Sequence, residues 1–298
     1  MQRTKNQTNS QPDFIITGDW HLREDQPECR TDNFWKAQWQ KVDFIADLQS
    51  KYDCPVLHSG DLFHHWKPSP YLLSETIKHL PSRFYTIYGN HDLPQHNLDL
   101  ANKCGVNVLW NADKLTVLDG VHWGQQPEKD DLFFFDGYSI LIWHTMTYTG
   151  KPLWPGMTDP KAEQLLKKYT EYKLIITGHN HQSFTAMVGD RILVNPGSIT
   201  RQTAAQIDHQ PCIYLWYEKE NRVVSVPLPA EEGVVSREHI ERKESHNTRI
   251  ESFVNHLNVD WGGLIGFEEN VERMMRENNI KQEVKDVVYK VLDSSKTI

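Results

Sequence analysis

Five short segments carry the side chains whose types and spacing could do metal chemistry. Each places carboxylate, imidazole or carboxamide groups directly after an apolar run that predicts a β-strand. The segments are GDWH over 18–21, GDLFH over 60–64, GNHD over 89–92, WHT over 143–145 and GHNH over 178–181. Because loops at the carboxyl ends of strands in an α/β sheet meet at one edge, we expect these groups to lie together.

The donor types indicate which ions would bind. Asp19 and His21 lie two residues apart, as do His179 and His181, so an extended chain points each pair to one face. Apart from Asp92, Asn180, His64 and His91, the five segments supply two carboxylates, one carboxamide and four imidazoles. This mixed set suits manganese, iron or zinc, whereas calcium prefers oxygen. One ion needs about four to six donors, so the sequence predicts two ions, a pair that promotes in-line displacement at phosphorus.

The elements that would position these loops alternate along the first two thirds of the chain, which predicts an α/β fold. Apolar residues recur every three or four positions over 32–50, indicating an amphipathic helix. Ser69 followed by Pro70 predicts a helix that starts there and ends near His79. Strands are predicted over 13–17, 55–59, 83–88, 106–110, 114–118, 132–135, 139–144, 173–177, 212–217 and 223–227.

Composition narrows the class of protein. The chain has 298 residues, with 32 Lys plus Arg against 40 Asp plus Glu, a net charge of −8. That charge argues against coating of nucleic acid by the whole surface, although a local basic groove stays open. The four cysteines lack metal-site spacing, which favours reduced thiols. No apolar run approaches the ~20 residues of a membrane span, and the first 12 residues do not resemble a targeting signal. We expect a cytoplasmic or nucleoid-associated protein that is not secreted.

The composition changes from about residue 231. We expect a flexible lead-in over 1–12, a catalytic domain over 13–230 and a helical C-terminal extension over 231–298. The extension has three apolar stripes, which would either cover the sheet or bind a partner.

The ordered set of motifs resembles the calcineurin-like metallophosphoesterase superfamily across residues 14–198. The resemblance implies a β-sandwich flanked by helices (αββα). A narrower resemblance rests on GDLFHHWKPS over 60–69, with DWHL over 19–22 and NPGS over 195–198. These segments look like the SbcD-type nuclease subunits of double-strand-break repair complexes. The GDxxDRG and GNHE motifs of protein serine/threonine phosphatases are absent from the sequence.

The family resemblance implies a role for each matching residue. One ion would be held by Asp19, His21, Asp61 and His181, and the other by Asp61, Asn90, His144 and His179. Asp61 would bridge the two, and a hydroxide held by the cations would attack phosphorus. The ions would be Mn²⁺, with Mg²⁺, Fe²⁺ and Zn²⁺ as alternatives.

The remaining polar residues of the motifs are assigned to catalysis. His91 would contact the phosphate and protonate the leaving oxygen, because its neighbour Asn90 already points to the ions. Asp92 would orient His91. His64 resembles the second phosphate-contacting histidine of the nuclease subgroup. Trp20 and Trp66 lie in site loops and are read as packing residues rather than base-stacking ones.

The resemblance implies a metal-dependent DNA nuclease in end processing and repair, with DNA ends as substrate. Its partners would be an SMC-like ATPase and, through helices 32–50 and 69–79, a second copy of the chain. The tail is short for the family's cap domain, so we expect a reduced cap or none. The alternative function is a small-molecule or cyclic-nucleotide phosphodiesterase, which the acidic charge favours. A non-catalytic scaffold would be expected to have lost ligands, and all seven are present.

Overall fold

The structure, a computed structural model, describes residues 11–127, 134–135, 137–242, 245, 248–250 and 267–295. It divides into two compact units, Met1–Ser236 and Arg237–Ile298, which are described separately. Most of the lead-in predicted over 1–12 lies outside the described residues.

Two β-sheets form the centre of the first unit. The six-stranded sheet has the order β11-β10-β1-β2-β3-β4, and the five-stranded sheet has the order β5-β6-β7-β9-β8. The strands of the first sheet are β1 (Phe14–Thr17), β2 (Val56–His58), β3 (Phe84–Thr86), β4 (Thr116–Val117), β10 (Cys212–Tyr217) and β11 (Arg222–Pro227). Those of the second are β5 (Phe134–Phe135), β6 (Tyr138–Trp143), β7 (Leu174–Thr177), β8 (Phe184–Val188) and β9 (Arg191–Asn195).

The parallel strands explain where the polar loops lie. In the first sheet β1, β2, β3 and β4 run parallel, and in the second β6, β7 and β9 do so. Each of the five motifs begins within three residues of the last residue of one of these strands. The loops therefore leave the two sheets at their carboxyl ends.

Strand β1 has four residues that are all buried, because both of its faces are covered. Phe14 and Ile16 point between the sheets and pack with residues such as Ile140 of β6. Ile15 points to the opposite face and packs against Val42 of a helix. Burying such a side chain contributes about 1.5–3 kcal/mol. An unbroken apolar run is thus what a strand between two layers requires.

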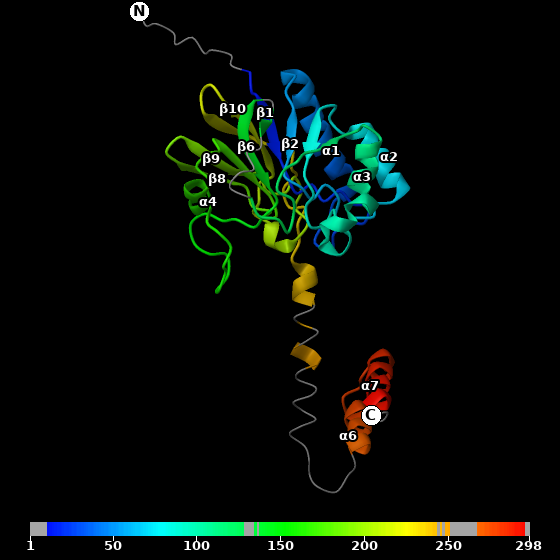
Figure 1. Cartoon of the computed structure of the whole chain (residues 1–298). Helices are drawn as coiled ribbons and strands as arrows, with labels where there is room; N and C mark the ends of the chain where they lie inside the picture. Colours follow the sequence, from blue (N-terminus) through cyan, green and yellow to red (C-terminus); the bar gives the residue numbers. More distant parts are fainter. Residues whose placement is uncertain are drawn as a thin grey trace, which may run out of the picture. The chain divides into compact units, whose positions relative to one another are not determined.

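Helices cover both outer faces of the paired sheets. α1 (Phe34–Tyr52), α2 (Pro70–His79) and α3 (Gly105–Asn111) lie on the side of the first sheet, and α4 (Ala162–Lys168) lies on the other side (Figure 1). The Ser69 hydroxyl accepts a hydrogen bond from Leu72 N at 3.0 Å, so α2 begins at the predicted cap. The layers are helix, sheet, sheet and helix, which confirms the expected αββα architecture.

The strand predicted over residues 106–110 is wrong, because this segment forms α3. Val106 and Leu109 are buried, three residues apart, whereas Val108 and Trp110 are exposed. The short VNVLW run therefore has helical as well as extended spacing, and packing against the first sheet decides for the helix.

The second unit contains α6 (Phe267–Glu277) and α7 (Gln282–Ser295). Val271 and Met275, one helical turn apart, are buried, whereas Val284 and Val287 of α7 are exposed. The first predicted stripe of the extension, from Ile250 onward, lies largely outside the described residues. None of the helices in the described ranges has the length and apolar character that a membrane crossing requires.

Candidate metal centre

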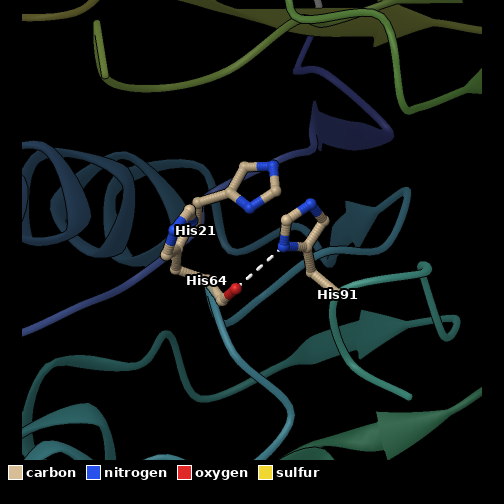
Figure 2. Close-up of side chains that lie close together, drawn as sticks. All are labelled: His21, His64 and His91. Carbon is tan, nitrogen blue, oxygen red and sulfur yellow. Dashed lines mark hydrogen bonds between the residues drawn. The ribbon is translucent and has the colours of Figure 1, made fainter. Parts of the chain in front are cut away.

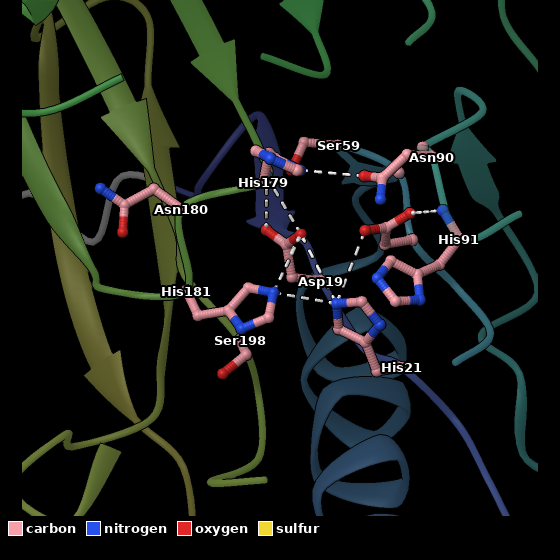
Figure 3. Close-up of polar contacts among 12 residues, drawn as sticks. Asp19, His21, Ser59, Asn90, His91, His179, Asn180, His181 and Ser198 are labelled. Carbon is pink, nitrogen blue, oxygen red and sulfur yellow. Dashed lines mark hydrogen bonds and ion pairs between the residues drawn. The ribbon is translucent and has the colours of Figure 1, made fainter. Parts of the chain in front are cut away.

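The five motif loops meet at the carboxyl edge of the two sheets, as the sequence predicts. Asp19, His21, Asp61 and His179 all have positive φ values, of 48°, 46°, 58° and 75°. Non-glycine residues rarely adopt this left-handed conformation, and it is concentrated at functional sites. The backbone thus bends sharply at four of the seven predicted ligands. Figure 3 shows the side chains of Asp19, His21 and His179 gathered in one place.

The first donor set comes from the loops after β1 and β7. His21 Nε2 lies 3.0 Å from His181 Nε2 and 3.9 Å from Asp19 Oδ1. His181 Nε2 lies 4.0 Å from the same Asp19 oxygen. Two imidazole nitrogens and a carboxylate oxygen thus converge, the arrangement that one ion of the manganese, iron or zinc group takes.

The second donor set comes from the loops after β3, β6 and β7. Asn90 Oδ1 lies 3.2 Å from His144 Nε2 and 2.9 Å from His179 Nδ1. The other ring nitrogen of His144 donates a hydrogen bond to Ser59 O at 2.7 Å. This bond leaves Nε2 of His144 directed at the set, as the outer partners of metal-bound histidines do.

Asp61 lies between the two sets. Its Oδ1 accepts a hydrogen bond from His91 N at 2.8 Å. Its Oδ2 is buried and has no hydrogen-bond partner among the described residues. The same Oδ2 lies 3.5 Å from His21 Nε2 and 3.4 Å from His144 Nε2, so it faces one member of each set. A buried carboxylate oxygen without a partner is costly, and two cations bridged by Asp61 would satisfy it.

The electrostatics of the centre also fit cations. Burial lowers the pKa of His179 and of His181 to about 4, and it holds the pKa of His21 well below its usual range. These imidazoles are therefore neutral at pH 7, which is the form that binds metals. Burial also raises the pKa of Asp19 to about 8, because its charge lacks compensation in the protein alone.

His144 and Asp61 partly compensate each other. Burial would raise the pKa of Asp61, but the His144 imidazole outweighs it and holds this pKa well below its usual value. Burial opposes a charge on His144, but the Asp61 carboxylate raises the pKa of His144 to about 9. Without bound cations, the proton on His144 therefore supplies the positive charge that balances the Asp61 carboxylate. A divalent ion held there would supply that charge instead.

His64 and His91 form a pair beside the first donor set. His91 Nδ1 donates a hydrogen bond to His64 O at 2.8 Å, and the two rings stack with centroids 5.3 Å apart. The ring of His91 is also 4.6 Å from that of His21 (Figure 2). Both His64 and His91 are half-buried, so they line the accessible side of the centre. The backbone bond fixes the proton on Nδ1 of His91 and leaves Nε2 for a ligand.

The expectation that Asp92 orients His91 was wrong. The Asp92 carboxylate is fully buried and accepts hydrogen bonds from the backbone N–H groups of Asp61, Leu62, Phe63 and Gly89, at 2.8, 3.3, 3.2 and 3.0 Å. Its lone pairs are therefore engaged by the chain itself. Asp92 ties the loop after β2 to the loop after β3, and the orienting bond of His91 comes from His64 instead.

The segment NPGS over 195–198, which is part of the narrower family resemblance, supports the loop after β7. Asn195 Nδ2 donates hydrogen bonds to Asn180 O at 2.6 Å and to Gln182 O at 2.7 Å. These bonds flank His181, so Asn195 holds the loop that carries two of the imidazoles.

Sequence reasoning missed one residue of the centre, Trp123. The centroid of its ring lies 4.8 Å from the ring centroid of His179 and 6.0 Å from that of His144. It belongs to none of the five motifs, and its only signal is its position in a short segment between Gly120 and Gly124. Trp20, which the sequence places in a site loop, is fully buried and donates a hydrogen bond to Thr17 Oγ1 at 2.8 Å. Trp20 is thus a packing residue.

Gly60 is required at the turn before Asp61, and Gly60→Ala is expected to lower the free energy of unfolding by about 3 kcal/mol. Gly60 has a φ of 98°, and an added Cβ would lie 2.7 Å from His144 Nδ1 and 2.8 Å from Gly89 N. Urea unfolding measures the loss. Gly124→Ala is the matched control, because its φ is 82° but nothing lies within 4 Å of the added Cβ. Equal losses in the two variants would contradict the steric account.

Binding of cations to the centre should stabilise the folded protein. At about 100 times its Kd, Mn²⁺ is expected to add about 2.7 kcal/mol, because the unfolded chain lacks the assembled donor sets. Thermal unfolding with Mn²⁺, and again after addition of EDTA, measures the shift and its reversal. Ca²⁺ should give a smaller shift, since most donors are nitrogen. An unchanged Tm in excess Mn²⁺ would count against the centre.

Comparison with known proteins shows to which family the chain belongs. Residues 13–215 match the model of the "Calcineurin-like phosphoesterase superfamily domain". A search of curated proteins found no match. Among solved structures, the chain is similar to an archaeal phosphodiesterase, with 15% identity over 72% of this chain and 99% of that one and a TM-score of 0.44.

Two further solved structures are similar to the chain. The protein TT1561 of Thermus thermophilus has 12% identity over 74% of this chain and 100% of that one, with a TM-score of 0.42. A single mutant of Vps29 from Entamoeba histolytica has 13% identity over 72% of this chain and 99% of that one, with a TM-score of 0.35. Since the family model spans well over half of the sequence, the chain belongs to the calcineurin-like phosphoesterase superfamily.

Proposed function

We propose that this protein is a metal-dependent phosphodiesterase that cleaves DNA. The observation that carries the hydrolytic part is the buried Asp61 Oδ2, which lacks a hydrogen-bond partner among the described residues and lies between two donor sets. Two divalent cations held there, Mn²⁺ in our proposal, would activate water and stabilise the charge that develops on the phosphoryl oxygens.

The side chains of the centre are assigned to cation binding, to protonation of the leaving oxygen and to contact with the phosphate. Asp19, His21 and His181 would hold one cation, and Asn90, His144 and His179 would hold the other, with Asp61 available to both. Protonated His91 would keep its Nδ1–H on His64 O and pass its Nε2 proton to the leaving oxygen, which leaves His91 as the neutral imidazole with its proton on Nδ1. Burial lowers the pKa of His64 to about 4, so at pH 7 His64 contacts the phosphate as a neutral imidazole.

Two features support DNA as the substrate. The first is the resemblance of residues 60–69 to the SbcD-type nuclease subunits, which includes His64. The second is the position of His64 beside His91 at the accessible side of the centre, where a phosphate in a chain can reach both rings. The net charge of −8 favours the second candidate, a cyclic-nucleotide or other small-molecule phosphodiesterase.

A substrate panel separates the two functions. The purified chain is incubated with Mn²⁺ and labelled single- and double-stranded DNA, with bis(p-nitrophenyl) phosphate and with cyclic nucleotides. DNA cleavage at a rate well above that of cyclic nucleotides is the expected result. Turnover of bis(p-nitrophenyl) phosphate without DNA cleavage would reject DNA, and fast hydrolysis of a cyclic nucleotide would then select the second candidate. Repeating the panel with Mg²⁺, Fe²⁺ and Zn²⁺ tests the choice of metal.

The partners are proposed on the same resemblance. An SMC-like ATPase would bind the helical extension, where the exposed Val284 and Val287 support an interaction surface. A second copy of the chain would pair through α1 and α2, where Tyr71 is exposed and stacks on Trp35 with centroids 5.3 Å apart. Light scattering at micromolar concentration tests the dimer, and a monomer mass would reject it.

A further inference from the structure

The metal centre has two unlike flanks. Beside the first donor set lie the imidazoles of His64 and His91, which are polar, and His91 is the proposed proton donor. Beside the second set lies the indole of Trp123, whose ring is tilted by 34° to that of His179 at a centroid distance of 4.8 Å. A phosphodiester also has two unlike arms, because one leaves as an alcohol that needs a proton and the other stays on phosphorus.

The position of Trp123 is fixed by its backbone. Trp123 N donates a hydrogen bond to Tyr88 O at 3.0 Å, and Val121 N donates to Ile142 O at 2.9 Å. His122 Nδ1 accepts from Tyr88 N at 3.2 Å. The segment 121–123 is thus attached near the carboxyl ends of β3 and β6, the strands whose loops supply Asn90 and His144. An aromatic ring held in this way is preorganised, so stacking on it costs little conformational entropy.

Trp123 is also partly accessible. It is half-buried, as is His179, so solvent reaches part of both residues, and their ring centroids are 4.8 Å apart. The other tryptophans of the predicted site loops do not compete for this place. Trp20 is fully buried. Trp66 is partly buried and packs against the core cluster on the outer side of the first sheet, with its ring centroid 5.8 Å from that of His65.

Resting on the proposed function, we propose that Trp123 is a specificity-determining residue that stacks the nucleobase on the arm of the phosphodiester that is retained. Every base has a π-face, so such a platform selects nucleotides over aliphatic esters without selecting a sequence. Beside the second donor set, the centre thus offers a half-exposed indole ring rather than a hydrogen-bonding side chain. The preference should therefore appear mainly in KM, because the stack forms on substrate binding and is kept in the transition state.

The test compares two substrates that share one leaving group. Thymidine 5′-(p-nitrophenyl phosphate) and ethyl p-nitrophenyl phosphate both release p-nitrophenolate, so they differ only in the retained arm. The measured quantity is the ratio of their kcat/KM values in the Mn²⁺-loaded protein. Stacking of one base predicts that Trp123→Ala and Trp123→Leu lower this ratio about tenfold, whereas Trp123→Phe keeps it within about twofold.

Trp110→Ala is the matched control, because Trp110 is 44% exposed on α3 and outside the centre. Its ratio should stay at the wild-type value, and all variants should bind two cations by elemental analysis. An unchanged ratio in Trp123→Leu, with the ethyl ester still hydrolysed, would overturn the assignment. So would an equal loss on both esters with one cation missing, which would make Trp123 a positioning residue for His179. If the wild-type protein hydrolyses neither ester, the proposed function itself fails.

Discussion

Asp61→Asn is expected to lower kcat/KM for phosphodiester hydrolysis by about 10³-fold, equivalent to about 4 kcal/mol. Asp61 Oδ2 lies within 3.5 Å of a ring nitrogen from each set. An amide in its place keeps the shape but removes the negative charge that both cations share. It also removes the counter-charge that raises the pKa of His144 to about 9, so the second donor set loses its charged partner.

Measuring the metal content of Asp61→Asn distinguishes the loss of a shared carboxylate from a general disruption of the fold. The variant should bind at most one cation per chain by elemental analysis, where the wild-type protein binds two. Asp47→Asn is the control, because this exposed carboxylate on α1 lies outside the centre, and it should leave both rate and metal content unchanged. An Asp61→Asn protein with two bound cations and more than about a tenth of the wild-type rate would contradict a bridging role.

His91→Gln is expected to lower kcat by 10²–10⁴-fold, about the range for loss of a general acid. Both cations should stay bound, because the His91 ring belongs to neither metal set in the proposed arrangement. The contact of His91 with Asp61 also survives, since it is made by the backbone N–H at 2.8 Å. This variant thus separates proton transfer from metal binding, which Asp61→Asn cannot do.

The leaving group provides a second measurement for the same variant. A p-nitrophenolate leaves readily without a proton, whereas the alkoxide of a DNA strand does not. The loss in His91→Gln should therefore be much smaller on bis(p-nitrophenyl) phosphate than on DNA. His65→Gln is the control, because His65 is exposed and next to His64 in sequence. Equal losses on both substrates would show that His91 acts otherwise than as an acid.

Much of the fold could be predicted because local patterns and packing agree. The Ser69–Pro70 pair marks the start of α2, and the apolar run 14–17 forms a strand whose two faces meet different layers. The prediction of a strand over 106–110 failed because the local pattern does not decide between strand and helix. In so short a run the apolar residues fit both the two-residue period of a strand and the 3.6-residue period of a helix, and the surface on which the segment packs selects the helix.

The convergence of the ligands could also be predicted, since each follows a strand of a parallel set. The spacing of the motifs does not show in which direction each polar side chain of a loop points. Asp92 directly follows His91 yet turns to four backbone N–H groups, because these would otherwise be buried without acceptors. Trp123 reaches His179 from a segment without a motif. Both results depend on tertiary contacts that spacing along the chain does not contain.

Anomalous diffraction from crystals soaked in Mn²⁺ tests the central claim most directly. The account predicts two peaks about 3.5–4 Å apart, one beside Asp19, His21 and His181 and the other beside Asn90, His144 and His179, with Asp61 touching both. A single peak, or none in excess Mn²⁺, would contradict it.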